Sequence, residues 1–100
     1  MLRPETVESL FYLWRATGDE QWRDKTWAIF QAFNTSSRVA FGFSGVRDVD
    51  HLPPRHDDRQ ESFWLAETLK YMWLSFADES ALDLEQWVFN TEAHPLRIWQ

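Results

Sequence analysis

Two carboxylates stand at the start of the first predicted helix, in a setting that suits acid and base chemistry. Pro4 fits the first position of a helix, and Glu5 then falls in the first turn. Unpaired backbone N–H groups and the helix dipole favour the ionised form of a carboxylate there. Glu8 follows on the same face. Such a carboxylate could act as a base or hold a cation through water, or it could simply begin the helix.

A third acidic residue, Glu67, lies within a strongly apolar stretch predicted to be helical. A buried glutamate must be paired, hydrated or functional, because an isolated charge is poorly tolerated away from water. Lys70 is close to one turn further along, so an ion pair between Glu67 and Lys70 is the simpler interpretation. A functional site is the alternative.

The remaining motifs point away from several kinds of chemistry. His94 has no second histidine three or four residues away, which makes a zinc site improbable and favours a structural, hydrogen-bonded role. The sequence has neither a glycine-rich phosphate loop nor a Gly-x-Ser-x-Gly elbow. Because there are no cysteines, disulfides and thiolate chemistry are excluded in this chain.

The elements that must position these residues are mostly helices. Apolar spacing predicts a helix over residues 4–17 that ends at Gly18, then a helix over residues 20–33 that Asp19 caps. The tight connection makes the two helices antiparallel. Alternation over residues 39–43 predicts a short strand or an extended arm, and residues 45–54 carry the turn residues of a surface loop.

The strongest helical prediction covers residues 58–76, where Asp58 and Glu61 resemble a capping box. Its apolar residues surround the helix, so we expect it to be buried on most sides. A short helical piece over residues 82–87 and a small hairpin or plug over residues 88–96 complete the prediction.

Composition allows one small domain and excludes some partners. The chain has 100 residues, of which 44% are hydrophobic and 17% aromatic, so a core is expected to take up most aromatic rings. A net charge of −6 argues against nucleic-acid binding and is compatible with a metal ion. No apolar run is long enough for a membrane span, and no signal-peptide pattern is present, which leaves the compartment undetermined.

Three stretches, RPETVES, ESFWLAETLKY and FNTEAHPL, occupy residues 3–9, 61–71 and 89–96. Together they resemble the C-terminal part of class I α-1,2-mannosidases, glycoside hydrolase family 47. The resemblance covers nearly the whole chain. It implies an all-α fold, a partial (α/α)7 barrel with a short C-terminal β-hairpin plug, in which residues 1–100 are the C-terminal part of the catalytic domain.

The resemblance implies an inverting, calcium-dependent enzyme that removes terminal α-1,2-linked mannose from N-glycans in the secretory pathway, either in the endoplasmic reticulum or Golgi or as a secreted protein. Carried over motif by motif, Glu5 would be the catalytic base and Thr91 would bind Ca2+ directly. The substrate-binding residues would be Arg3, Glu8, Phe63, Glu67 and Glu92. Among them Phe63 would stack beneath the sugar, and Glu92 would hold waters around the ion.

A complete barrel of fourteen helices of about 12 residues, with loops of about 4–6 residues, needs more than about 200 residues. We therefore expect the rest of the barrel, with the catalytic acid, to lie outside this chain, and the isolated chain to be inactive. Two alternatives remain open. One is a non-catalytic relative that binds mannose glycans in glycoprotein quality control, and the other is a helical interaction module whose motif matches are coincidental.

Overall fold

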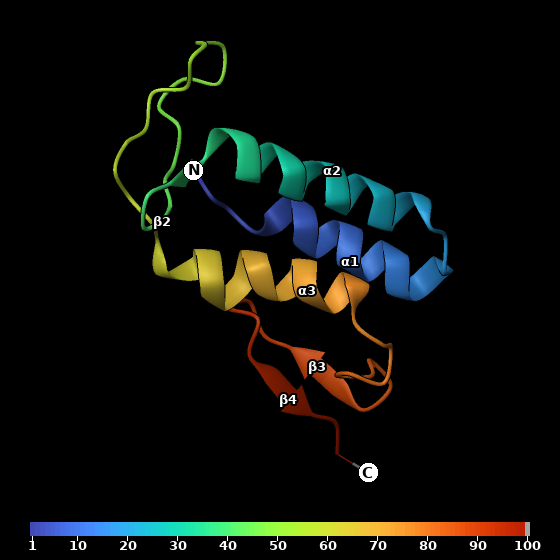
Figure 1. The fold of residues 1–100 in the computed structure, drawn as a ribbon. Helices are drawn as coiled ribbons and strands as arrows, with labels where there is room; N and C mark the ends of the chain where they lie inside the picture. Colours follow the sequence, from blue (N-terminus) through green and yellow to red (C-terminus); the bar gives the residue numbers. More distant parts are fainter. Residues whose placement is uncertain (100) are drawn as a thin grey trace.

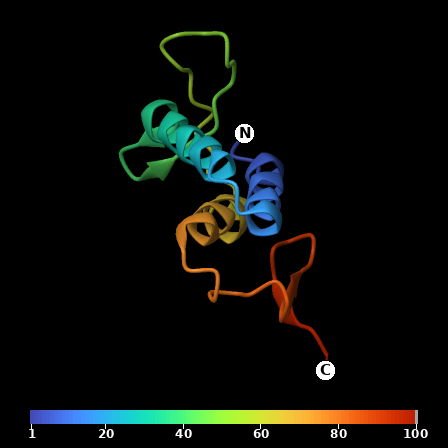
Figure 2. The same ribbon diagram turned by 90° about the vertical axis from the view of Figure 1, so that its right-hand side faces the viewer.

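Three helical segments pack side by side in a computed structural model that describes residues 1–99 (Figure 1). They are α1 (Glu5–Thr17), α2 (Gln21–Ser36), and a third helix in which η1 (Trp64–Leu69) continues directly into α3 (Lys70–Phe76). A small hairpin lies below the third helix and contributes to its packing, as the turned view also shows (Figure 2). The predicted helical architecture with a C-terminal hairpin is therefore present.

The first two helices form the predicted antiparallel hairpin. Gly18 takes a left-handed φ of 67° and donates its backbone N–H to the Trp14 carbonyl at 2.8 Å, which ends α1. Asp19 accepts the Gln21 N–H at 3.0 Å, as its predicted capping role requires. The second helix runs to Ser36 instead of residue 33, because Asn34 and Thr35 face solvent and do not interrupt the helical bonding.

The third helix departs from its prediction at the start. It begins at residue 62, and Asp58 is no capping residue because it has a left-handed φ of 58°. The neighbouring Asp57 instead accepts the Arg59 N–H at 3.0 Å and the Ser44 hydroxyl at 3.3 Å. The segment Trp64–Leu69 is a π-helix, a wide turn that is frequent at functional sites and that apolar periodicity did not predict.

The segment between α2 and the third helix folds back on itself. The predicted single strand is wrong, since Ala40 and Phe41 form a turn between β1 (Arg38–Val39) and β2 (Gly42–Phe43), which pair antiparallel. Gly42, the first residue of β2, has a φ of 140° that favours glycine. The predicted surface loop over residues 45–54 is present and projects away from the helices (Figure 1).

The helical piece predicted over residues 82–87 is wrong, because the chain there forms turns. Leu82 has a left-handed φ of 57°, and the Asp83 carboxylate accepts the Glu85 N–H at 2.9 Å. Arg15 from α1 donates to the carbonyls of Leu82 and Ala81 at 3.2 and 3.0 Å, a long-range contact that local patterns do not reveal. The following hairpin of β3 (Trp87–Phe89) and β4 (Pro95–Arg97) confirms the prediction for the tail.

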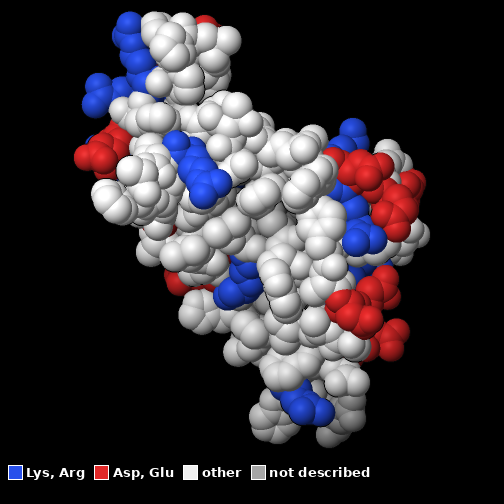
Figure 3. Space-filling view, in the orientation of Figure 1, with Lys and Arg blue, Asp and Glu red and all other residues white. Residues whose placement is uncertain are grey.

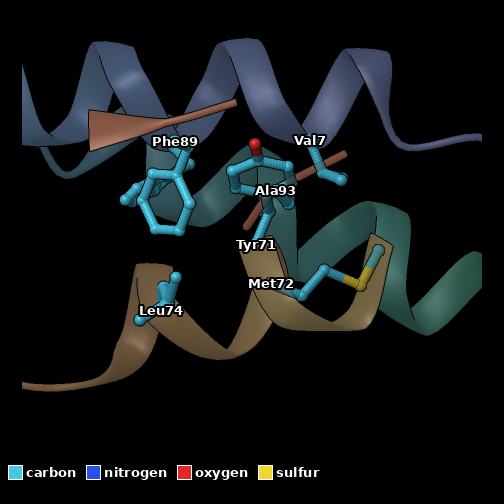
Figure 4. Packing of buried hydrophobic residues seen from close by; sticks show 7 residues of the cluster. Val7, Tyr71, Met72, Leu74, Phe89 and Ala93 are labelled. Carbon is cyan, nitrogen blue, oxygen red and sulfur yellow. The ribbon is translucent and has the colours of Figure 1, made fainter. Parts of the chain in front are cut away.

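One hydrophobic cluster joins α1, α3 and the hairpin (Figure 4). Tyr71 projects from α3 toward α1, and its ring centroid lies 5.5 Å from that of Phe11 and 5.7 Å from that of Phe89. The buried members of the cluster are Val7, Phe11, Tyr71, Met72, Leu74, Phe89 and Ala93. This cluster fixes α1 relative to the third helix, and therefore fixes the residues at their shared end.

Fewer aromatic residues lie in the core than expected, since the buried ones within residues 1–99 are Phe11, Trp64, Tyr71 and Phe89. Leu65 and Trp73 on the third helix are 62% and 65% exposed, so the helix is not buried on most sides. Trp73 also belongs to an apolar patch around a shallow hollow of about 400 Å3, made by Trp27, Phe30, Leu69, Met72, Trp73 and Phe76. Figure 3 shows a broad uncharged area over the middle of one face.

Within residues 1–99, no helix combines the length and apolar character needed to cross a membrane.

We expect Phe11→Ala to lower the free energy of unfolding by about 3–5 kcal/mol, because the substitution leaves a cavity where a fully buried ring was packed. The matched control is Phe41→Ala, since Phe41 is fully exposed, and its effect should stay below about 1 kcal/mol. Urea-induced unfolding followed by tryptophan fluorescence measures both. Similar losses for the two variants would contradict the core described above.

Candidate functional site

The site predicted from the sequence lies where α1 and the third helix begin, at the same end of the molecule (Figure 1). The segment before α1 is held there by the Thr68 hydroxyl, which donates to the Leu2 carbonyl at 2.7 Å in a buried hydrogen bond. Removing either partner would leave a buried polar group unpaired, so this bond strongly constrains the segment. The residues that follow Leu2 are thereby placed beside η1.

Arg3 connects the beginning of α1 to the aromatic ring of Phe63. Its Nη1 atom lies 3.8 Å from Oε1 of Glu5, and its guanidinium carbon lies 5.8 Å from the Phe63 ring centroid. The Arg3 and Glu5 side chains are 58% and 66% exposed, so this ion pair contributes little to stability. Instead, it brings a cation, a carboxylate and an aromatic face together on an open surface.

Three carboxylates approach one another at this end. Burial raises the pKa of Glu8 above its usual value of 4.5, and the negative charges of Glu67 and then Glu5 raise it further. The charges of the predicted residues Glu5 and Glu67 therefore both act on Glu8, although the three residues come from two helices. Their repulsion opposes folding, and carboxylates gathered in this way are typical of functional sites, where a cation or a proton relieves it.

Two tyrosines border the carboxylates. Burial is the main cause that raises the pKa of Tyr71, and the charge of Glu8 adds to it; burial and Glu8 also raise the pKa of Tyr12. Both phenols thus stay protonated at neutral pH and can donate hydrogen bonds. The sequence interpretation assigned Tyr71 only to the apolar surface of the helix. Its spacing of four residues from Glu67 could have shown that both lie on one face.

The predicted ion pair between Glu67 and Lys70 is wrong. The Lys70 ammonium group donates to the Ala93 carbonyl at 2.8 Å, and the ion pairs within residues 1–99 are Arg3 with Glu5 and Arg23 with Glu20. A contact between residues 23 positions apart replaces the local one. Glu67 is therefore not neutralised by a basic side chain in the described part of the chain.

The turn between β3 and β4 carries the two predicted residues of the tail, Thr91 and Glu92. Both are exposed. The Asn90 side-chain oxygen accepts the backbone N–H groups of Glu92 and His94, each at 2.9 Å. His94 thus takes part in the turn through its backbone, and Lys70 connects the turn to the third helix one turn after Glu67.

The atoms with which Thr91 and the predicted acidic residues could bind a metal ion are all oxygens. Within residues 1–99, no group of three or more acidic or histidine side chains is arranged to hold a metal. A cation would have to be held mainly through the carbonyl and hydroxyl of Thr91 and through water, with the carboxylates further out. A hard ion such as Ca2+ takes about 6–8 oxygen ligands, including carbonyls and waters, and this donor set fits it.

The geometry therefore joins the predicted residues in two groups. Arg3, Glu5, Glu8, Phe63 and Glu67 gather where the two helices begin. Thr91 and Glu92 lie in a turn that is attached to the third helix. The catalytic, sugar-binding and metal-binding roles of these residues stay predictions.

Comparison with known proteins matches residues 1–98 to glycosyl hydrolase family 47. The chain is 55% identical over 98 residues to mannosyl-oligosaccharide 1,2-alpha-mannosidase MNS1 of Arabidopsis thaliana, covering 98% of this chain and 17% of that protein. Identity to mannosyl-oligosaccharide 1,2-alpha-mannosidase IC of Homo sapiens is 51%, over 98% of this chain and 16% of the relative.

A solved structure, the alpha-1,2-mannosidase from Trichoderma reesei, superimposes with a TM-score of 0.93 at 43% identity. The match covers 99% of this chain and 22% of that one. The chain therefore spans less than a quarter of the length of these relatives.

We expect Glu8→Gln to raise the melting temperature at pH 7 by roughly 2–4 °C, because it removes a charge that burial disfavours and that Glu67 and Glu5 repel. An acid whose pKa is raised on folding binds more protons in the folded state, so stability falls as pH rises above its usual value of 4.5. The gain should accordingly shrink at pH 4. Thermal unfolding followed by circular dichroism measures it.

The matched control is Glu85→Gln, which removes the same charge from an exposed turn. A gain of equal size in both variants, or one that does not depend on pH, would show that the carboxylates at the candidate site do not repel one another.

Proposed function

The chain belongs to glycosyl hydrolase family 47, and from this membership we propose that it supplies one side of the active site of an enzyme that trims mannose from N-glycans. The bond cleaved would be a terminal α-1,2 linkage, by analogy with relatives named 1,2-alpha-mannosidases. The observation that carries the proposal is the gathering of Glu5, Glu8 and Glu67 beside Phe63, because a hydrolase needs carboxylates next to a surface that accepts sugar.

Glu5 is the proposed catalytic base. It stands in the first turn of α1, and it is exposed enough to reach water. In an inverting reaction the base takes a proton from water as that water attacks the anomeric carbon from the face opposite the leaving group. The leaving oxygen receives its proton from an acid on the other face, and we propose that this acid lies outside these 100 residues.

Phe63 and Arg3 are proposed to bind the sugar ring. The Phe63 ring is half-buried and offers an apolar face to the C–H groups of a mannose ring. The guanidinium of Arg3 can donate to sugar hydroxyls, and the carboxylates of Glu8 and Glu67 can accept from them. The network would hold the anomeric carbon near Glu5.

Thr91 is proposed to bind Ca2+ through its carbonyl and hydroxyl oxygens, with Glu92 accepting hydrogen bonds from the surrounding waters. When bound, the ion would supply positive charge that offsets the carboxylate repulsion and orients water and sugar hydroxyls. The oxygen-only donor set and the exposure of the turn support this assignment.

The wider architecture proposed is an (α/α)7 barrel in which the hairpin of β3 and β4 is the plug. Two observations support it: the close superposition on the Trichoderma reesei enzyme and the apolar patch around Trp73, a surface suited to packing against further helices. Because N-glycans are carried by secretory and cell-surface proteins, we propose that the parent protein acts in the secretory pathway or outside the cell.

The decisive experiment places the chain in an otherwise complete enzyme. We expect a chimera, in which residues 1–99 replace the matching segment of the Trichoderma reesei α-1,2-mannosidase, to hydrolyse an α-1,2-linked mannobiose. Glu5→Gln in the chimera should reduce kcat by about 10²–10⁴, the usual contribution of a general base. The 100-residue chain alone should release no mannose.

Glu85→Gln, on the turn before β3, is the control and should keep full activity. A folded chimera that binds the disaccharide without cleaving it would favour a glycan-binding module instead. Full activity of the Glu5→Gln chimera would end the assignment of the base, and mannose release by the isolated chain would show that no external acid is needed.

A further inference from the structure

We propose that Lys70 is a positioning residue that sets the calcium affinity of the Thr91 turn without touching the ion. The inference deepens the proposed function and rests on it. It starts from the contact that replaced the expected ion pair: the Lys70 ammonium group donates to the Ala93 carbonyl at 2.8 Å. This contact is partly buried and connects the third helix to the turn between β3 and β4.

Ala93 is where this contact constrains the turn. It is fully buried, and its φ of 59° is left-handed, a conformation that an L-residue other than glycine adopts only when its surroundings impose it. The carbonyl that Lys70 binds belongs to this residue. A charged donor makes a stronger hydrogen bond than a neutral one, so Lys70 is well suited to hold the turn in this form.

Asn90 holds the same turn from its other side. Its side-chain oxygen accepts the N–H groups of Glu92 and His94 at 2.9 Å, and the Ala93 N–H donates to its backbone carbonyl at 3.1 Å. Thr91 and Glu92 are therefore exposed in a turn that the hydrogen bonds of Asn90 and of Lys70 hold in place. The Lys70 contact is the hydrogen bond that ties this turn to the helix carrying Glu67, and the packing of Ala93 and Phe89 against Tyr71 adds to it.

Two side chains of the third helix, two residues apart, each donate a hydrogen bond to a distant part of the chain. Thr68 binds the carbonyl of Leu2 and places the residues at the start of α1, whereas Lys70 binds that of Ala93 and places the tail. Calcium sites set their affinity by ligand charge and by the rigidity of the site. Loss of the Lys70 contact should therefore weaken calcium binding even though no ligand is removed.

The test compares Lys70→Met, Lys70→Arg and Arg15→Met in the 100-residue chain. Arg15 is the matched control, because it is another basic side chain that donates to the carbonyls of a turn, the one over Glu79, Ala81 and Leu82. Calcium titration by calorimetry gives the affinity, and hydrogen exchange at Glu92, Ala93 and His94 reports the order of the turn without metal.

We expect Lys70→Met to weaken calcium binding about tenfold and to speed amide exchange in the Thr91 turn. Lys70→Arg, which keeps a charged donor, should restore most of both. Arg15→Met should lower the melting temperature at least as much as Lys70→Met while leaving calcium affinity unchanged, a separation that a purely structural role for Lys70 would not produce.

Calcium affinity in Lys70→Met equal to that of the wild type would overturn the role of Lys70 and leave the proposed metal site intact. Failure of the wild-type chain to bind calcium would instead refute the metal site. In that case Lys70 sets no calcium affinity, and unchanged amide exchange in Lys70→Met would show that it does not position the turn either.

Discussion

The packing of α1 against the third helix forces three carboxylates together, and this electrostatic cost is the constraint on which the rest of the structure depends. Burial, and then the negative charges of Glu67 and Glu5, raise the pKa of Glu8 and oppose its ionisation, so the arrangement does not stabilise the fold. It persists because the core centred on Phe11 and Tyr71 fixes the two helices. The stability contributed by the core thus outweighs the cost of burying Glu8 near the charges of Glu67 and Glu5.

The third helix organises the site through contacts on either side of Glu67. The Thr68 hydroxyl holds the start of the chain, and the Lys70 ammonium group holds the turn of Thr91. Both residues lie at or next to the π-helical segment, whose wider turn alters the directions in which side chains project relative to an α-helix. In this way stretches at the beginning, middle and end of the sequence are joined to one element.

Local patterns predicted what local interactions determine. The end of α1 at Gly18 and the C-terminal hairpin followed from turn residues and apolar spacing. The helix expected over residues 82–87 failed because Arg15, far away in the sequence, binds the carbonyls of that region. The expected pairing of Glu67 with Lys70 failed in the same way, since Ala93 binds the ammonium group instead.

The burial of the third helix could not be predicted from periodicity, because apolar spacing does not tell which apolar faces are covered within the chain. Leu65 and Trp73 illustrate this. Glu5, Glu8 and Glu67 were identified as candidates from their helix positions and from the family resemblance. Tyr71 was missed because a tyrosine on an apolar face resembles a core residue, although burial and then the charges of Glu8 and Glu67 raise the pKa of its phenol.

We propose that three distant stretches of sequence converge on one hydrated cation. Anomalous diffraction from crystals of the chimera, soaked with a calcium-mimicking lanthanide, tests it most directly. The account predicts one strong peak at about 2.3–2.6 Å from the oxygens of Thr91, with waters between the ion and the carboxylates of Glu8 and Glu67. A peak bound elsewhere, or Thr91 oxygens turned away from those carboxylates, would contradict it.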